Sequence, residues 1–232
     1  MTRSLNEIVY DVIELYRANY KVTDSLDERQ VVSWINSTRA TLLREGTKSI
    51  KFMDPHNVQT LSQVELELVD SINVPSLTNG GRVLRTKKEI PSFINGRDNF
   101  PMIVRVYGAE IGGEPFEVIS PYMAPYSGSG KFNGNTIYVY YYNKKLYLTS
   151  KSGLHKTIKY ITVDGLFSNP IEAYEFVNGE DSYDWNMEYP ISESLVKLLM
   201  DEVIKTKFNF ILYPPQDPVN NASDDLTNKP VE

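Results

Sequence analysis

Cysteine is absent from this chain of 232 residues, and histidine occurs only twice. Without cysteine there are no disulfides, thiolate zinc sites, iron–sulfur clusters or cysteine nucleophiles. No apolar run approaches the roughly 18 residues that mark a membrane span, and acidic residues interrupt the apolar positions of the N-terminal segment, unlike in a secretory signal. The sequence therefore predicts a protein without a membrane segment, made and used without export.

Apolar content is high enough to exclude a disordered chain. Hydrophobic residues make up 41% of the sequence and aromatic residues 12%, so burial can offset the conformational entropy lost on folding. Tyrosine occurs 16 times. Because its side chain combines a rigid apolar body with a polar tip, it suits half-buried sheets and protein interfaces. The composition favours a globular interaction protein.

The charge balance is mildly acidic but uneven. The chain carries 24 basic and 30 acidic residues, a net charge of −6 that argues against coating DNA with its whole surface. The stretch 144–159 contains no acid and five lysines: Lys144, Lys145, Lys151, Lys156 and Lys159. These lysines fit either solvated strand edges or a basic surface that faces DNA or an acidic neighbouring subunit.

Two capping boxes mark the starts of two N-terminal helices. In each box, a serine and a glutamate three residues later can satisfy backbone amides that a helix start leaves unpaired. Ser4–Glu7 predicts a helix from about Leu5 to Tyr20, and Ser25–Glu28 predicts a second helix that ends at Gly46. The apolar positions of both follow the spacing of one buried face: Leu5, Ile8, Val9, Val12, Leu15, Tyr16, Val31, Val32, Ile35, Leu42 and Leu43.

From about Val58 to Val177 the pattern changes to short β-type runs separated by turns. Glycine-bearing breaks such as Asp164-Gly165 and Asn178-Gly179 divide the runs, which favours an antiparallel sandwich or small barrel. The clearest hairpin turns at Asn143-Lys144. The predicted strands are Val64–Val69, Met102–Tyr107, Phe116–Ile119, Thr136–Tyr142, Lys145–Thr149 and Tyr160–Val163.

A last helix, capped at Ser192, is expected to continue to about Phe210. The proline-rich sequence that follows predicts an extended arm. The fold class is therefore α+β, with a helical frame of two N-terminal helices and one C-terminal helix, a large antiparallel β sandwich or barrel insertion, and a C-terminal arm. The predicted domains are a helical domain (1–55 and 186–213), a β-rich insertion (56–185) and the arm (214–232).

The sequence shows no pattern typical of catalysis, cofactor binding or metal binding. His56 and His155 lie in turn-like contexts, and no serine occupies the glycine-flanked turn of a triad nucleophile. The glycines of 128–135 lack the spacing and lysine position of a phosphate loop. Asp181, Asp184 and Glu188 lack the calcium-loop spacing. We expect no catalytic residue, no cofactor and no metal.

Four stretches resemble the ring, or head-to-tail connector, proteins of crAss-like tailed bacteriophages. They are MTRSLNEIVYDVIELYR, ERQVVSWINSTRATLLRE, YITVDGLFSNP, and YPISESLVKLLMDEVIKTKF with the Pro-Gln-Asp arm that follows it. The resemblance implies a structural virion protein, made in the host cytoplasm, that forms a dodecameric ring below the portal. The ring would belong to the DNA conduit and contact the portal and other ring or tail proteins.

Two groups of residues are expected to serve such a ring. An extended arm adds contact area without enlarging the domain, and head-to-tail contacts can close into rings. We expect inter-subunit contacts from arm residues Tyr213, Pro214, Pro215, Asp217 and Asn221. The strands around the predicted hairpin would meet another ring layer, and the five lysines of 144–159 would face another ring or DNA in the conduit.

Two rival functions remain open at this level. A host-surface or carbohydrate-binding β module of a phage tail would stack exposed tyrosines of 138–142 on sugar rings. A carbohydrate-active enzyme would place two carboxylates, for which Glu110, Glu114 and Glu117 are candidates, about 5 to 10 Å apart in one cleft.

Overall fold

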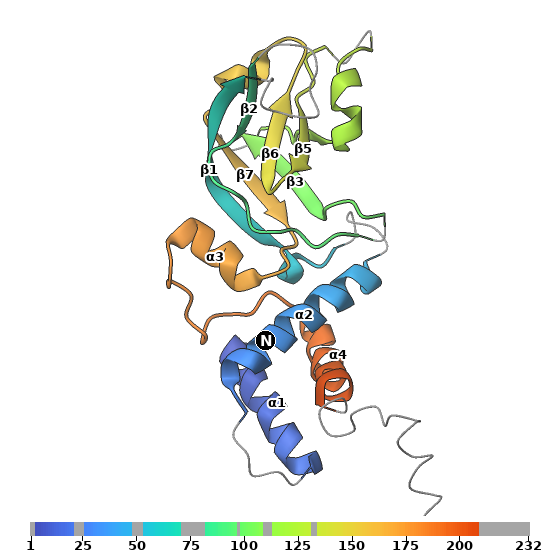
Figure 1. Cartoon of the computed structure of the whole chain (residues 1–232), viewed down its shortest axis with the longest axis vertical. Helices are drawn as coiled ribbons and strands as arrows, with labels where there is room; N and C mark the ends of the chain where they lie inside the picture. The colour runs from blue at the N-terminus through green and yellow to red at the C-terminus, as the bar shows by residue number, and fades with distance from the viewer. Residues whose placement is uncertain are drawn as a thin grey trace, which may run out of the picture.

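The computed structural model of the chain describes residues 3–20, 26–47, 53–70, 82–96, 98–108, 113–130 and 134–208. The molecule is elongated, with helices at one end and a β-barrel at the other (Figure 1). The α-helices are α1 (Leu5–Tyr20), α2 (Glu28–Gly46), α3 (Pro170–Asn178) and α4 (Glu193–Val203). The strands are β1 (Gln59–Asp70), β2 (Arg82–Thr86), β3 (Ile103–Gly108), β4 (Glu117–Val118), β5 (Tyr138–Tyr142), β6 (Lys145–Thr149) and β7 (Tyr160–Gly165). Short helices are η2 (Pro55–Asn57), η4 (Pro121–Tyr126), η5 (Leu154–Thr157) and the π-helical η6 (Ile204–Phe208).

The start of α1 confirms the first capping box. The backbone N–H of Ser4 donates to Glu7 Oε2 at 3.0 Å, and the N–H of Glu7 donates to Ser4 Oγ at 3.2 Å. Each side chain thus pairs an amide that the first helical turn leaves without a partner. Helix α1 has the bounds that its sequence predicts.

The second cap is a different residue from the one predicted. Asp27 is the N-cap of α2, and its Oδ1 accepts from the N–H of Arg29 at 3.0 Å. Aspartate directly before the first helical residue can bond the free amides there and places a negative charge at the positive helix end. Ser25 lies outside the described residues, while the end of α2 at Gly46 is as predicted.

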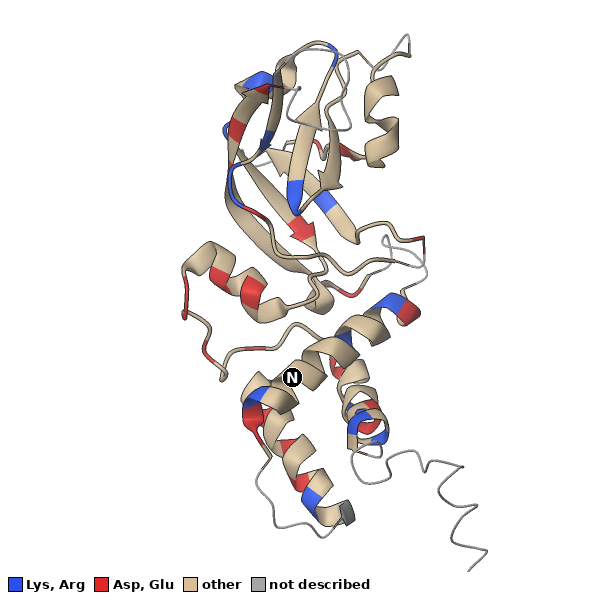
Figure 2. Cartoon of the chain, in the orientation of Figure 1, with Lys and Arg blue, Asp and Glu red and all other residues tan. Residues whose placement is uncertain are grey.

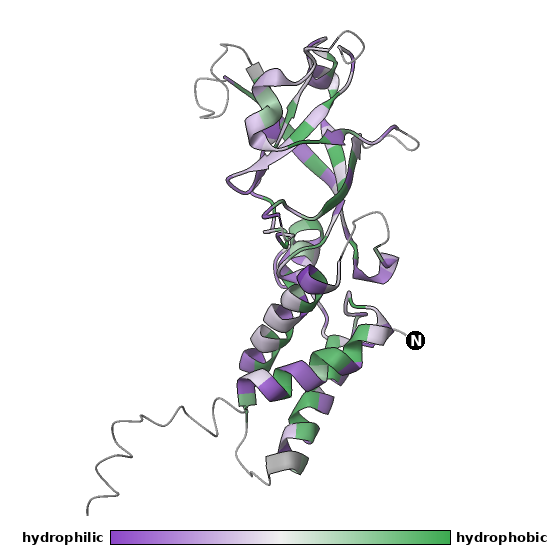
Figure 3. Cartoon of the chain, turned by 90° about the vertical axis from the view of Figure 1, so that its right-hand side faces the viewer, coloured by the Kyte–Doolittle hydropathy of each residue, from purple (hydrophilic) through white to green (hydrophobic). Residues whose placement is uncertain are grey.

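Helices α1, α2 and α4 share one hydrophobic core. Their apolar stripes meet residues of the segment that leads into α4. Figure 3 shows hydrophobic residues (green) alternating with hydrophilic ones (purple) along these helices. Leu15 is an exception to the predicted stripe, because it is 38% exposed on α1. The buried members are Leu5, Ile8, Val9, Val12, Tyr16, Val31, Val32, Ile35, Tyr189, Ile191, Val196, Leu199, Val203 and Phe208.

The sheet has seven strands in the order β3-β7-β1-β2-β6-β5-β4 and curls into a nearly closed barrel. All neighbouring pairs are antiparallel except β4 and β5, which are parallel. At the seam between β3 and β4, the N–H of Phe116 donates to the carbonyl of Val106 at 2.7 Å. The barrel interior holds a second core: Leu61, Val64, Leu84, Ile90, Phe93, Ile103, Val106, Val139, Leu146, Leu148, Ile161, Val163, Phe167 and Ala173.

Strand β1 bends to serve both halves of the barrel. Its first half pairs with β7 and its second half with β2, and the register shifts between Leu61 and Val64. Gln63 adopts a positive φ of 53° at this point. A bulge of this kind kinks a strand and increases its twist, which lets one long strand turn a barrel corner.

The β5–β6 hairpin turns where predicted. Asn143 and Lys144 both have positive φ, of 47° and 56°, as a two-residue type I′ turn requires. The predicted strands all lie within or overlap strands of the structure. Strand β2 was not predicted, because its arginines interrupt the apolar pattern.

Two predictions about the end of the β region are wrong. Gly165 does not form a break, since it is the last residue of β7 and pairs with both β1 and β3. The segment 170–178 is helix α3, which starts at Pro170 behind the N-cap Asn169 and packs Ala173 into the barrel core. Proline at a first helical position is preorganised for a helix, and the Asn169 side chain caps the first turn, so this segment forms a helix and not a strand.

The α+β class and its helical frame are confirmed. Helix α4 follows Ser192 as predicted, but the regular α-helix ends at Val203 and continues as the π turn η6 to Phe208. The predicted arm (214–232) lies outside the described residues.

Candidate functional site

The helical end and the barrel meet at Arg39, which is fully buried on α2. Its Nε donates to the carbonyl of Pro190 at 2.7 Å and its Nη1 to that of Phe167 at 2.9 Å. Its Nη2 donates to Asn57 O at 3.2 Å, and the Tyr189 ring centroid lies 5.8 Å from its guanidinium carbon. Burial lowers the pKa of Arg39. Asn57 precedes β1, Phe167 follows β7 and Pro190 precedes α4. The single Arg39 side chain therefore connects three segments of the chain.

A second polar contact and an apolar cluster complete this junction. The N–H of Ser192 donates to Asn57 Oδ1 at 2.7 Å, which links the start of α4 to the segment before β1. Beside it, a cavity of about 460 Å³ lies between α2 and α4. The apolar cluster consists of Leu43, Ile94, Met102 and Leu166. Buried contacts from four parts of the chain therefore hold the helices against the barrel.

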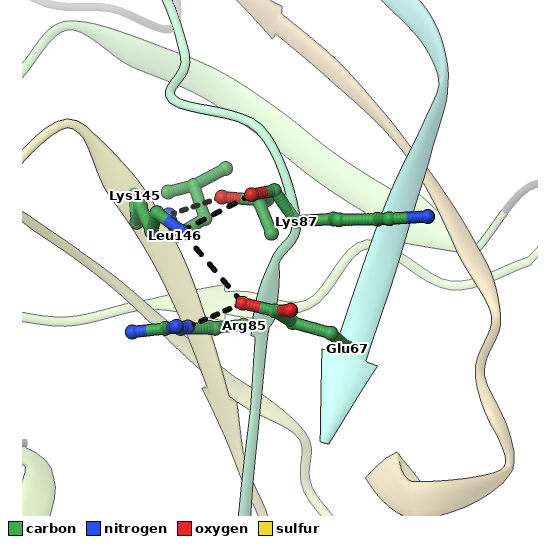
Figure 4. A network of polar contacts seen from close by, with 6 residues as sticks. Glu67, Arg85, Lys87, Lys145 and Leu146 are labelled. Carbon is green, nitrogen blue, oxygen red and sulfur yellow. Dashed lines mark hydrogen bonds and ion pairs between the residues drawn. The ribbon is translucent and has the colours of Figure 1, made fainter. Parts of the chain in front are cut away.

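A charged ladder crosses the outer face of β1, β2 and β6 (Figure 4). Glu67 Oε1 accepts from Arg85 Nε at 2.7 Å and lies 3.7 Å from Lys145 Nζ. Lys87 pairs with Glu65 at 3.0 Å, and its carbonyl accepts from Lys145 Nζ at 3.1 Å. Opposite charges on neighbouring strands stabilise a sheet modestly.

The structure divides the five predicted lysines between separate places. Lys144 and Lys145 lie at the β5–β6 turn, where Lys145 belongs to the charged ladder and its side chain is only 17% exposed. Lys151 and Lys156 follow the other end of β6, and Lys159 precedes β7. These three and Lys144 are exposed. Figure 2 shows basic and acidic residues interspersed over the barrel.

The tyrosines proposed for sugar stacking do not form an exposed platform. Tyr138 and Tyr140 of β5 are buried, at 5% and 0% exposure, and the Tyr140 ring stacks on Tyr147 at 5.1 Å between centroids. Tyr141 meets Phe93 edge to face at 5.0 Å. These rings stabilise the barrel instead, which removes the observation that favoured a carbohydrate-binding module.

The two most exposed tyrosines among the described residues lie on η4, a short helix that the sequence pattern did not predict. Tyr122 is 87% exposed, Tyr126 72% and Met123 56%. Between them Ala124 is buried against Val83, Tyr140 and Tyr147. The signal in the sequence was the uncharged run PYMAPY, in which two prolines flank aromatic residues within a polar loop.

The titratable groups are dispersed. His56 is exposed, with its Nδ1 3.5 Å from Glu188, whereas His155 is buried in η5 and burial lowers its pKa. Glu114 and Glu117 are exposed near β4, and Glu110 lies outside the described residues. Across the part of the chain that the structure describes, no group of three or more His, Asp or Glu is arranged to hold a metal ion.

A buried carboxylate braces the barrel near the junction. Asp164 on β7 accepts a hydrogen bond from Thr60 Oγ1 at 2.6 Å and another from Arg105 Nε of β3. The Arg105 side chain is 60% exposed and lies over the Tyr107 ring, 5.1 Å from its centroid. Both partners are on strands that flank β7, so Asp164 connects three strands.

The arm residues expected at a subunit contact, Tyr213, Pro214, Pro215, Asp217 and Asn221, lie outside the described residues. Among the residues that are described, no helix combines the length and apolar character needed to cross a membrane.

The sequence matches a known protein family over most of its length. No curated protein sequence matches this chain. Residues 7–226, nearly the whole sequence, match a family model described as Phage tail ring protein 2, of crAss-like phages. The match includes both cores and extends into the predicted arm. The chain therefore belongs to the phage tail ring protein 2 family of crAss-like bacteriophages.

Proposed function

We propose that this chain forms a dodecameric ring in the head-to-tail connector, below the portal, and that the ring is part of the DNA conduit. The family is one of structural tail ring proteins, which assigns the chain to the virion and to self-assembly. The family match over residues 7–226 carries the proposal. Its structural role also supports a non-enzymatic function.

The rigid junction supports a ring-forming subunit. Head-to-tail contacts close into a ring only when every subunit applies the same rotation, and a fixed angle between the two ends of the molecule provides this. Arg39 and the apolar cluster around Leu43 fix that angle. We assign the helical core and the barrel core to two domains, 1–55 with 186–213 and 56–185, because each has its own buried cluster.

The arm (214–232) is proposed to contact the adjacent subunit. Its expected contact residues are Tyr213, Pro214, Pro215, Asp217 and Asn221. Extended segments that lie across a neighbour add interface area while the folded domains keep their size, and they order on binding.

The exposed lysines are the proposed contacts with DNA or with the next ring layer. Lys144, Lys151, Lys156 and Lys159 have exposed side chains, whereas Lys145 is paired within the sheet. DNA must slide through a conduit, so we expect weak, salt-dependent attraction. Replacing the four exposed lysines with glutamine should reduce retention of the ring on DNA at low salt, and replacing Lys145 alone should have little effect on it.

The mass in solution tests the ring. Twelve chains of 26.5 kDa give 12 × 26.5 kDa, or about 318 kDa, by light scattering. Deletion of 214–232 should shift the protein to smaller species. A full-length chain that stays monomeric both alone and with the purified portal would contradict the proposal. Imaging of particles with a tagged chain tests its position, and density away from the portal would contradict the connector assignment.

A further inference from the structure

The exposed face of η4 is an apolar surface held rigidly on the barrel. We call Tyr122, Met123, Pro125 and Tyr126 the tyrosine ledge. All four residues are exposed, and Tyr122 is the most exposed large apolar side chain among the described residues, at 87%. The buried Ala124 fixes η4 against Tyr140 and Tyr147, whose rings stack on each other. The ledge is therefore held by a small cluster on β2, β5 and β6 that is separate from the interior core of the barrel.

The size and chemistry of the ledge are those of a contact surface. A tyrosine side chain offers about 200 Å² of area, so these exposed fractions leave on the order of 400 Å² of largely apolar surface in water. The largest patch on a typical monomer is of about this size and is often functional. No charged residue occurs from Ser120 to Gly130, so the ledge can be covered without desolvating a charge.

The sequence Tyr213–Pro218 has the chemistry that fits this ledge. It reads YPPQDP, in which Pro215 and Pro218 are three residues apart. Proline-rich segments favour the polyproline II helix, which has three residues per turn, so prolines three positions apart in such a helix share one side. Aromatic side chains recognise such segments because the prolines pack between rings at low entropic cost.

The length of the chain favours a segment from another copy. In Figure 1, η4 lies at the end of the barrel away from the helices, and α4 lies on the other side of the junction. Phe208 is the last residue of η6, which continues α4. Sixteen helical residues of α4 and η6 (193–208) cover about 24 Å from the junction, and the barrel adds a further distance. Extended chain spans at most about 3.5 Å per residue, so Pro214 and Pro218 lie within about 21 and 35 Å of Phe208. A segment that binds the ledge of a neighbouring subunit does not have to span the length of the molecule to which it belongs.

We propose that residues Tyr213–Pro218 of one subunit bind the tyrosine ledge of a second copy of this chain. This inference rests on the proposed ring, and it names the surface that receives the arm. Because the arm leaves one end of the molecule and the ledge lies at the other, the contact is heterologous. Such contacts repeat from subunit to subunit and generate rings when the rotation closes.

The absence of cysteine makes disulfide trapping a direct test. Full-length chain carrying Tyr122→Cys and Pro215→Cys is assembled, oxidised and resolved by non-reducing electrophoresis. A disulfide forms only when two Cβ atoms approach to about 4 Å. We expect a ladder of covalent dimers, trimers and larger species that collapses on reduction. The matched control is Tyr10→Cys with Pro215→Cys, because Tyr10 is also exposed, at 64%, but lies on α1.

Each outcome of the trapping has a distinct meaning. A ladder with the ledge pair and at least fivefold less with the control pair supports the contact. Equal ladders, a cross-linked monomer, or no cross-link within rings whose mass is confirmed would each overturn it. If rings form without the cross-link, only the proposed contact is refuted and the proposed function is still supported. Absence of both rings and cross-links in the presence of portal would count against both.

A second measurement avoids engineered cysteines. Binding of a labelled synthetic peptide covering 209–222 is measured by fluorescence anisotropy on full-length chain diluted until it is monomeric, so that no neighbouring arm occupies the ledge. Tyr122→Ala with Tyr126→Ala should weaken peptide binding at least tenfold, and Tyr10→Ala should change it less than twofold. The exposed positions of all three side chains predict unchanged melting temperatures. Equal affinity in the ledge variant, or no binding to the parent chain, would overturn the proposal.

Discussion

The guanidinium of Arg39 donates a hydrogen bond of 2.9 Å to the carbonyl of Phe167, whose ring stacks on Phe93 in the barrel at 4.7 Å between centroids. One residue of the barrel core thus receives a charged donor from a helix of the other core. A charge-assisted hydrogen bond in a buried site is strong, and its loss leaves the acceptor unsatisfied. The orientation of the two ends of the molecule is consequently built into a few buried contacts.

Replacing Arg39 with methionine should destabilise the chain by about 3–5 kcal/mol, because the carbonyls of Asn57, Phe167 and Pro190 lose their donor while the aliphatic volume is largely kept. Denaturation in urea measures the change. Arg44→Met is the control, since Arg44 is exposed on the same helix and should change stability by less than about 0.5 kcal/mol. A loss below about 1 kcal/mol for Arg39→Met would show that water replaces the guanidinium.

Gly165 is a position where a methyl group has no room. A Cβ there would lie 2.6 Å from Phe93 Cε1 and 3.3 Å from the carbonyl oxygen of Met102. Gly165→Ala should therefore cost about 1–3 kcal/mol, as overpacking of a core does. Gly46→Ala is the matched change, because its Cβ meets nothing within 4 Å at the end of α2, and it should be neutral or stabilising. Equal melting temperatures for the two variants would contradict the prediction.

His155 should make the barrel sensitive to mild acid. It is buried, its Nδ1 has no hydrogen-bond partner among the described residues, and burial, reinforced by Lys156, lowers its pKa below the ordinary histidine value of 6.5. As the pH falls, His155 therefore binds a proton in the unfolded chain before it does so in the folded chain. The stability contribution is complete above pH 6.5 and is lost as the pH falls from there through the folded pKa.

Chemical denaturation at pH 7.5 and 5.5 measures this effect. His155→Phe should reduce the loss of stability between the two pH values, since phenylalanine cannot titrate. His56→Phe, at the exposed histidine, should retain the contribution of His155. An unchanged pH dependence in His155→Phe would mean that other groups cause the loss.

The capping box of α1 predicts a small, specific loss. Ser4→Ala removes the acceptor of the Glu7 amide and should cost about 1 kcal/mol. Ser33→Ala is the same chemical change at an exposed position inside α2, where alanine favours the helix, so it should be neutral or slightly stabilising. Thermal unfolding followed by circular dichroism distinguishes the two, and matching melting points would show that the cap is dispensable.

Local signals in the sequence were sufficient for most elements. The Ser4–Glu7 box located the start of α1, the apolar spacing gave the buried face of α2, and the Asn143-Lys144 turn fixed the β5–β6 register. These features depend on residues within a few positions of one another, so their physics is visible without the fold. Helix α3 was missed because it is short and its mixed apolar and polar residues suit either a strand or a helix, although Asn169 and Pro170 are a helix-start signal.

The candidate surfaces depended on tertiary structure. The five lysines of 144–159 are close in sequence, but β6 separates them and Glu67 pairs with one of them. Tyr140 and Tyr122 are both tyrosines in a β-rich region, yet one is buried and the other is 87% exposed.

The sequence by itself determined the helices, most strands, the α+β class and the family resemblance, because hydrophobic period, caps and turns are short-range properties. Only the tertiary structure decided that Arg39 binds carbonyls 18, 128 and 151 residues away, that β1 bends to turn the barrel corner, and that η4 presents its tyrosines to solvent. Burial and long-range hydrogen bonding depend on which distant segments pack together, and local residue patterns do not specify that packing.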